Sequence, residues 1–171
     1  MEKDELKEKL EGARPAPWEQ IPDIGLYKDQ LTEYLKRQHI GFVLEEEEPL
    51  TSAMINNYIK AGVLPRANGK RYGRDHVAYL TAVSLLKQVL SVQETGKLLG
   101  AQTEGGDVRE FYGRYCDELD SALGAACEKL GGSGSGPDGG RDKDKLSELA
   151  LRLAVESYAD KLLCREILGM L

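Results

Sequence analysis

Apolar residues recur at intervals of three and four positions along most of this chain, which is the spacing of amphipathic helices. In residues 26–37 this stripe consists of Leu31, Tyr34 and Leu35. The same spacing marks five later stretches, which are residues 51–61, 73–90, 91–99, 105–130 and 145–168. The pattern predicts a mainly helical protein and leaves only the connecting segments for strands.

Local capping signals predict where several of these helices begin or end. Thr51 is an N-cap candidate because its hydroxyl oxygen can accept a hydrogen bond from a backbone N–H of the first turn. Gly62 is suited to end the same helix because glycine adopts positive φ without strain. Ser91 and Glu94 have the spacing of a capping box, in which each side chain accepts from the backbone N–H of the other residue.

The connection between the helices at 51–61 and 73–90 contains a strong turn signal. Asn68-Gly69 favours a two-residue hairpin turn, since both residues tolerate positive φ. Arg66 precedes this turn, and Lys70 and Arg71 follow it. We therefore predict a basic β-hairpin here, the element called the wing in winged helix-turn-helix proteins. The predicted fold class is all-α, mainly helical, with one small β-hairpin wing and additional C-terminal helices.

Changes in composition predict five segments along the chain. They are a charged, proline-rich N-terminal arm at residues 1–20, a helix-turn-helix core with a preceding helix at 21–110, a helix at 111–130, a flexible Gly/Ser linker at 131–144 and a C-terminal helix at 145–171.

Charge is distributed unevenly along the chain, whose net charge is −6. Residues 49–90 carry six basic residues and the single acid Asp75, a net of +5. The segments before and after them are acidic, with nets of −6 for residues 1–48 and −5 for residues 91–171. The basic segment coincides with the predicted wing and its flanking helices, so an anionic partner is expected there.

Several classes of protein are not expected from this sequence. No apolar run has the length of a membrane span, and the acidic start of the chain does not resemble a signal peptide, so we expect a cytoplasmic protein. The three cysteines, Cys116, Cys127 and Cys164, fit no zinc-binding spacing and are expected to pack as small apolar residues. No nucleophile–base pair or phosphate-binding glycine loop is present. We therefore expect neither an enzyme nor a metal, cofactor or small-molecule site.

The residues best suited to bind DNA lie within the basic segment. Asparagine can form two hydrogen bonds with an adenine edge, and serine can bond a base or a phosphate, so the exposed side of the helix at 51–61 is the candidate reading surface. Bases near the turn and at the start of the next helix are candidates for phosphate contacts. The full candidate set is Ser52, Asn56, Asn57, Lys60, Arg66, Lys70, Arg71 and Arg74.

Two resemblances support this interpretation. Leu50 to Tyr58, Gly62 to Pro65 and Lys70 to Tyr72 resemble the second helix, turn and wing of the MerR class of bacterial regulators. Ile21-Pro22-Asp23, Leu26 to Gln30, Leu50 to Tyr58, Lys70 to Tyr72 and Leu86 to Ser91 resemble the DUF1836 family of low-GC Gram-positive bacteria over roughly residues 20–110. That family name assigns no activity. The resemblance implies a bacterial cytoplasmic protein with a MerR-like helix-turn-helix.

Two functions remain open on the sequence alone. The first is a transcriptional regulator that binds double-stranded DNA, with the C-terminal helices as a possible homodimer interface. The second is a protein-interaction adaptor that uses the same fold without DNA. A positive surface around Asn56, Lys70 and Arg71 that is free of the acidic run Glu45–Glu48 would favour DNA, and a surface capped by that run would favour the adaptor.

Overall fold

The computed structural model describes residues 2–38, 50–132 and 139–171, with the side chains of the last segment described from Lys143 onward. This part of the chain forms seven α-helices and one short 3₁₀ turn. The helices are α1 (Lys3–Gly12), α2 (Lys28–Arg37), α3 (Ser52–Lys60), α4 (Arg74–Leu86), α5 (Val92–Thr103), α6 (Val108–Gly131) and α7 (Gly139–Met170), and the turn η1 spans Trp18–Gln20. None of the described helices is long and apolar enough to cross a membrane.

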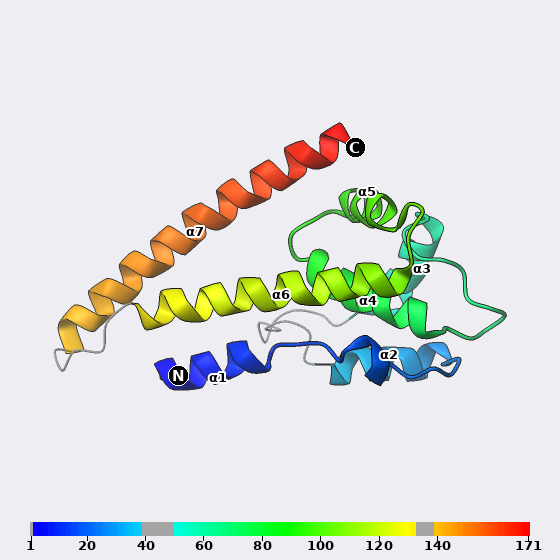
Figure 1. Cartoon of the computed structure of the whole chain (residues 1–171), viewed down its shortest axis with the longest axis horizontal. Helices are drawn as coiled ribbons and strands as arrows, with labels where there is room; N and C mark the ends of the chain where they lie inside the picture. The colour runs from blue at the N-terminus through cyan, green and yellow to red at the C-terminus, as the bar shows by residue number, and fades with distance from the viewer. Residues whose placement is uncertain (1, 39–49, 133–138) are drawn as a thin grey trace.

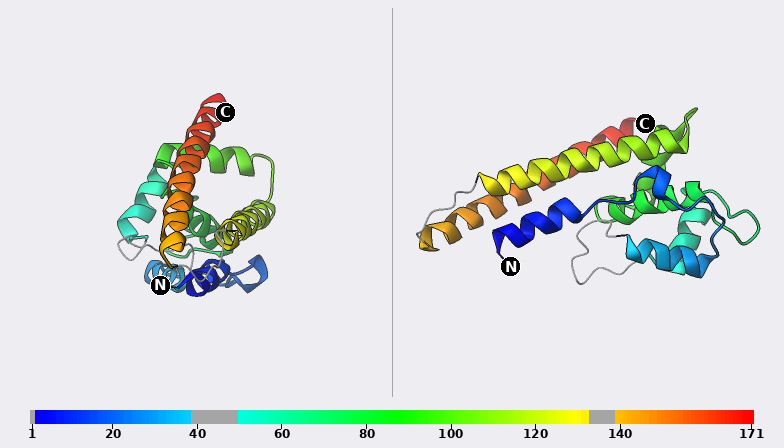
Figure 2. Two further views of the ribbon diagram at one scale, coloured as in Figure 1. Left: turned by 90° about the vertical axis from the view of Figure 1, so that its left-hand side faces the viewer. Right: turned by 60° about the horizontal axis from the view of Figure 1, so that its bottom comes forward.

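Four short helices form a compact body at one end of the molecule. α2, α3, α4 and α5 gather around the first half of α6, while α6 and α7 extend together to the other end (Figure 1). The N-terminal helix α1 lies alongside α6, as the second view of Figure 2 shows. Arg14, just after α1, pairs with Asp120 of α6 and fixes this contact. The predicted N-terminal arm therefore contains a helix, α1, that packs against α6.

α4 is the central helix of the body. It packs against both α2 and α6, and six of its residues are buried, from Val77 to Val83. The fully buried Leu31, Ile55 and Leu80 bring α2, α3 and α4 into one apolar cluster. Burial of these apolar side chains, with α4 packed between α2 and α6, contributes most of the free energy that stabilises the body.

The predicted β-hairpin wing is wrong. The described residues contain no strand, and a tight turn with Gly69 and Lys70 at its centre, one position later than expected, is closed by a single isolated bridge between Asn68 and Arg71. The next hydrogen-bonded pair of a hairpin would join the Gly73 N–H to the Arg66 carbonyl. The His76 ring binds both of these backbone groups instead. Its Nδ1 accepts from the Gly73 N–H at 3.1 Å, so Nε2 carries the proton and donates to the Arg66 carbonyl at 3.1 Å. The described part of the chain is therefore built from helices, with turns and isolated bridges between them but no strand.

Tyr72, which would lie in the second strand of the predicted hairpin, forms an isolated bridge with the segment before α2. Its backbone exchanges two hydrogen bonds of 2.8 Å with Leu26, just before α2. Both side chains are buried in the core. The connection between α3 and α4 is thereby joined to the N-terminal side of α2 instead of standing apart as a wing.

The last helix differs from its expected bounds. α7 begins at Gly139, whereas residues 131–144 were expected to form a linker and the helix to begin at 145. Gly131 and Gly132 end α6, and residues 133–138 lie outside the described part. The three cysteines are half-buried and free of disulfides, which fits their expected role as small packing residues.

Two tyrosines on α6 allow a paired stability test of the core. Tyr112 donates to the Ala16 carbonyl at 2.7 Å, whereas the buried hydroxyl of Tyr115 has no hydrogen-bond partner among the residues described. Burial raises the pKa of both phenols, so both stay protonated. Tyr112→Phe should lower the free energy of unfolding by about 1–2 kcal/mol, because the Ala16 carbonyl loses its donor.

Tyr115→Phe is the matched change in this test. It should leave the free energy of unfolding unchanged or raise it by about 1 kcal/mol, since it removes a desolvated hydroxyl that bonds nothing in the described structure. Urea denaturation of both variants measures the difference. The assignment fails if Tyr115→Phe proves the more destabilising of the two.

Candidate nucleic-acid interface

α3 is a short helix with one buried and one exposed side. Thr51 caps its first turn by accepting from the Met54 N–H at 3.2 Å, as its sequence position predicts. Ile55 and Tyr58 insert into the core and hold the helix against the body. The opposite side is solvent-exposed and presents the four candidate reading residues Ser52, Asn56, Asn57 and Lys60.

The end of α3 is held by a glycine turn and by α5. Gly62 has φ of +74°, and the N–H groups of Val63 and Leu64 both donate to the Tyr58 carbonyl. Val63 then lies against α5 at Gly96, where a Cβ atom would come within 2.9 Å of the Val63 Cγ2. The exposed side of α3 is therefore presented on a rigid support.

A lysine from α2 joins the exposed side of α3. The Lys28 Nζ donates to the Asn56 Oδ1 at 2.6 Å. The contact orients the amide of Asn56 so that its NH₂ group points away from Lys28 and remains available as a donor. No local pattern predicts Lys28, because the two residues are 28 positions apart and meet only when α2 packs on α3.

Two candidate cations lie on the exposed connection between α3 and α4. This connection projects from the end of the body beyond α3 (Figure 1). Lys70 is exposed directly after Gly69, whose φ of +63° allows the tight turn, and Arg66 is exposed before it. Both side chains can reach an anion that approaches this end of the molecule.

Arg71 is bound to the segment before α2. Its guanidinium donates to the Gly25 carbonyl at 3.1 Å and to the Tyr27 hydroxyl at 3.3 Å, and it lies 4.7 Å from the centre of the Tyr27 ring. Gly25 makes this approach possible, since a Cβ there would come within 2.9 Å of the Arg71 Cβ. Arg71 thus keeps an exposed cation near α3 but is less free to move than Lys70.

Arg74 has a largely internal environment. Only 24% of its side chain is exposed. Its Nε donates to the Ile21 carbonyl at 3.1 Å, its guanidinium lies 5.6 Å from the Trp18 ring centre, and Asp23 is 3.8 Å away. These contacts attach the segment at residues 18–23 to the start of α4. Arg74 therefore differs from the exposed candidates, Arg71 included, because most of its side chain is buried against the protein.

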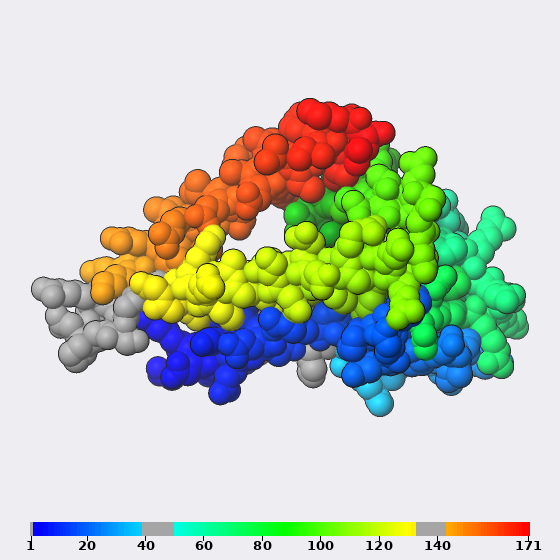
Figure 3. Space-filling view, in the orientation of Figure 1, coloured from blue at the N-terminus to red at the C-terminus, as the bar shows by residue number. Residues whose placement is uncertain are grey.

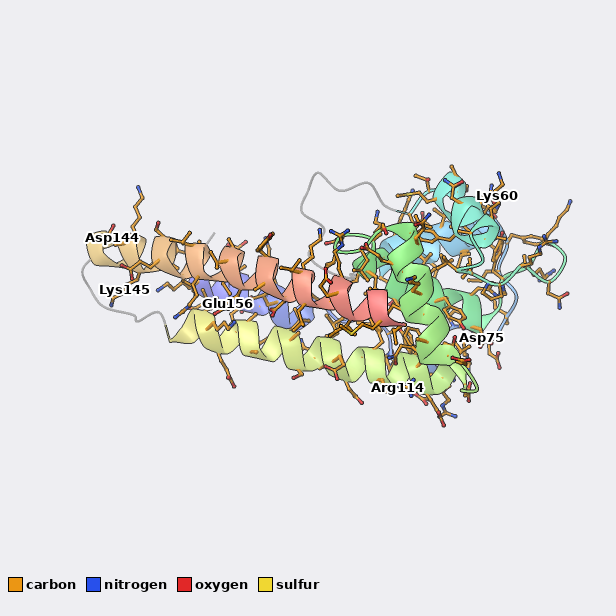
Figure 4. The ribbon with its side chains drawn as sticks, turned by 90° about the horizontal axis from the view of Figure 1, so that it is seen from above. Lys60, Asp75, Arg114, Asp144, Lys145 and Glu156 are labelled. Atoms are coloured by element: carbon orange, nitrogen blue, oxygen red, sulfur yellow. The ribbon has the colours of Figure 1, made fainter. Side chains whose placement is uncertain are left out.

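Exposed acids also lie beside the candidate cations in the described part of the chain, since Asp29 follows Lys28 in the first turn of α2 and Asp23 lies 3.8 Å from Arg74. Asp75 in the first turn of α4 is exposed, and Figure 4 places it at the same end of the molecule as Lys60. The acidic run Glu45–Glu48, which was to decide between DNA and the adaptor, lies outside the described residues. Five cations of this surface, Lys28, Lys60, Arg66, Lys70 and Arg71, outnumber the three exposed acids Asp23, Asp29 and Asp75.

The remaining candidates, a metal site and a small-molecule cavity, have little support in the described part of the chain. Among residues 2–38, 50–132 and 139–171, no three metal-ligating side chains gather in one place. A shallow, mainly apolar cavity of about 400 Å³ lies between α3 and the α4–α5 connection. Met54 and Tyr58 form its α3 wall. The polar exposed side of α3 faces away from the core that this cavity borders.

Comparison with known proteins identifies a family but no characterised relative. A family model described as domain of unknown function DUF1836 matches residues 16–115, which is more than half of the chain. The match begins before η1 and ends within α6, so it includes α2 to α5 and the connection between α3 and α4. No curated protein and no solved structure matches the chain.

Proposed function

We propose that this chain, which belongs to the DUF1836 family, is a cytoplasmic transcriptional regulator that binds double-stranded DNA through the exposed side of α3. The supporting arrangement is MerR-like, with α2 behind α3 as the supporting helix and α4 and α5 as the core beneath it. The observation that carries the proposal is the exposed polar side of α3, anchored by Ile55 and Tyr58 and bordered by cations from three segments.

The dimensions of α3 suit the major groove of DNA. A helix with its side chains is about 10–12 Å across, and the groove is about 12 Å wide. Ser52, Asn56 and Lys60 follow one another at intervals of four positions, so they form one row along the exposed side. In this arrangement Asn56 and Asn57 contact base edges, Ser52 contacts a base or a phosphate, and Lys60 contacts the backbone.

The cations around α3 supply the electrostatic contribution. Lys28 holds Asn56 and adds a charge beside it. Lys70 and Arg66, on the connection to α4, are placed to meet phosphates on the side of the groove beyond the end of α3. With few phosphate contacts, binding to random sequence should be weak and strongly dependent on salt.

Fluorescence anisotropy with a random-sequence duplex tests this proposal. The full chain should bind at low salt and lose affinity as salt rises. Lys60→Ala combined with Lys70→Ala should flatten the plot of log affinity against log salt by about 0.9 for each phosphate that the variant no longer neutralises. Lys143→Ala is the matched control, because this exposed lysine neighbours Asp144, which Figure 4 places at the opposite end of the molecule from Lys60.

Two results would overturn the proposal. Absence of binding at low salt would remove DNA as the partner and leave the adaptor function in its place. An equal effect per charge removed, in Lys143→Ala and in the Lys60→Ala, Lys70→Ala variant, would show that binding depends on general charge and does not use this surface.

A further inference from the structure

The outer side of α7 carries a continuous row of exposed apolar residues. Leu151, Val155, Tyr158 and Leu162 are 68%, 61%, 70% and 48% exposed. Their spacing of four, three and four positions is the heptad repeat that places residues along one side of a coiled-coil helix. We name these four residues the α7 stripe. Large apolar side chains in such a row favour burial against a partner surface.

The described residues of the chain cover only the other side of α7. Leu149 is buried near the start of the helix and Leu168 near its end, and Lys97 of α5 donates to the Leu168 carbonyl at 3.3 Å. Between them Glu156, which Figure 4 labels, pairs with Lys129 of α6. Figure 3 shows a hollow between the middle parts of α7 and α6. α7 is thus attached mainly near its ends, and the α7 stripe has no cover from the described residues.

The charges beyond the two ends of the stripe have opposite signs. Glu148 lies three positions before Leu151, and Arg165 lies three positions after Leu162, so both continue the same heptad row. The row is symmetric about the midpoint between Glu156 and Ser157. A second α7 that runs antiparallel, related by a two-fold axis at that midpoint, places Glu148 opposite Arg165 of the other copy.

The same axis pairs the remaining positions. Leu151 meets Leu162, and Val155 meets Tyr158, so the apolar layers are filled in both directions. At the edge of the stripe Lys145 and Glu166 of the other copy lie on the same side of the seam, offset by about 3 Å along the helix axes, which is within reach of an ion pair. Arg165 already uses its Nε to bind Glu94 of α5 at 2.6 Å, but its two NH₂ groups remain as donors, and the side chain is 56% exposed.

A parallel pairing in register lacks this complementarity. It would place Glu148 against Glu148 and Arg165 against Arg165 along the seam, and like charges in such positions disfavour association. We propose that the α7 stripe is the interface of an antiparallel two-fold homodimer, with a second copy of this chain as the occupant. The proposal stands on α7 alone and does not require DNA binding.

Sedimentation equilibrium of the full chain tests this proposal. At tens of micromolar the wild type should have twice the chain mass of 18.9 kDa. Val155→Glu combined with Tyr158→Glu should make it monomeric, because charges then replace the central layers. Leu163→Glu is the matched control, since Leu163 is 60% exposed on the same helix but lies off the stripe, and this variant should remain a dimer. Circular dichroism verifies that all variants stay helical.

A charge exchange tests the antiparallel register. Lys145→Glu should weaken the dimer about two- to fivefold, because it lies within reach of Glu166 of the other copy, and Lys145→Glu with Glu166→Lys should restore it. A monomeric wild type, or a double stripe variant that remains dimeric, would overturn the interface. Failure of the exchange to restore affinity would overturn the antiparallel register.

Discussion

Ile55→Ala is expected to lower the free energy of unfolding by about 2–5 kcal/mol, the usual range for removal of a fully buried aliphatic side chain. Ile55 is completely buried on the inner side of α3, where it packs into the cluster shared with α2 and α4. Its loss leaves a cavity under the middle of the candidate reading helix. Urea denaturation monitored by circular dichroism measures the effect.

Asn57→Ala is the matched change two positions away on the same helix. Asn57 is exposed, so its replacement should change the free energy of unfolding by no more than about 0.5 kcal/mol. The same variant should weaken binding to a selected DNA site by about 1–3 kcal/mol if the side chain contacts a base edge. Equal loss of stability in the two variants would contradict the division of α3 into a buried and an exposed side.

Arg74→Ala is expected to lower the free energy of unfolding by about 1.5–3 kcal/mol, the range for a hydrogen bond that involves a charged group. The side chain is mostly buried and binds the Ile21 carbonyl and the face of the Trp18 ring. The ion pair with Asp23 adds little, because that carboxylate is largely exposed. Thermal and urea denaturation both measure the loss.

Two further variants distinguish this structural role from a phosphate contact. Arg74→Lys should recover little of the stability, since an ammonium group cannot reproduce the planar guanidinium stacked near Trp18. Lys70→Ala should leave stability unchanged, because Lys70 is an exposed loop residue. If Arg74→Ala is as stable as Lys70→Ala, the attachment of residues 18–23 to α4 does not depend on this arginine.

The helices could be predicted because their signals are local. Thr51 and the Ser91–Glu94 pair make the capping hydrogen bonds that their spacing indicates, with the Ser91 N–H donating to Glu94 at 2.8 Å. Gly62 adopts the positive φ that ends α3. Such features depend on a few neighbouring residues, and tertiary packing does not override them here.

The wing could not be predicted because a residue outside the turn decides it. A tight turn does form at Gly69-Lys70, one position later than the Asn68-Gly69 signal indicates, but His76 takes the Gly73 N–H and the Arg66 carbonyl that the next hydrogen-bonded hairpin pair needs. The Tyr72 backbone then pairs with Leu26, 46 positions before it. A turn signal indicates where the chain reverses and leaves open whether a ladder follows.

The sequence could predict which residues of α3 are exposed, but not which candidate cations have partners in distant segments. Helical periodicity separates the exposed residues of α3 from the buried Ile55 and Tyr58 without knowledge of the fold. The partners of Arg71 and Arg74, and the presence of Lys28, follow from segments that are distant in sequence. Charge counts along the chain therefore overstate how many cations of residues 49–90 are free to meet an anion.

The α7 stripe shows a further limit of periodicity. The apolar markers of the C-terminal helix are visible in the sequence, but they lie on more than one side of the helix. Only the structure shows that Leu149 and Leu168 face the body while Leu151, Val155 and Tyr158 face outward. The division of these residues between an internal contact and an exposed row is what identifies the stripe as a surface for a partner.

The central claim is that the exposed side of α3 contacts DNA, and backbone amide chemical-shift mapping tests it most directly. The full chain is titrated with a random-sequence duplex at low salt, and the shifted amides are placed on the structure. We expect the shifts to concentrate on Ser52 to Lys60 and on the connection that carries Arg66 and Lys70. Absence of shifts, or shifts confined to α6 and α7, would contradict the claim.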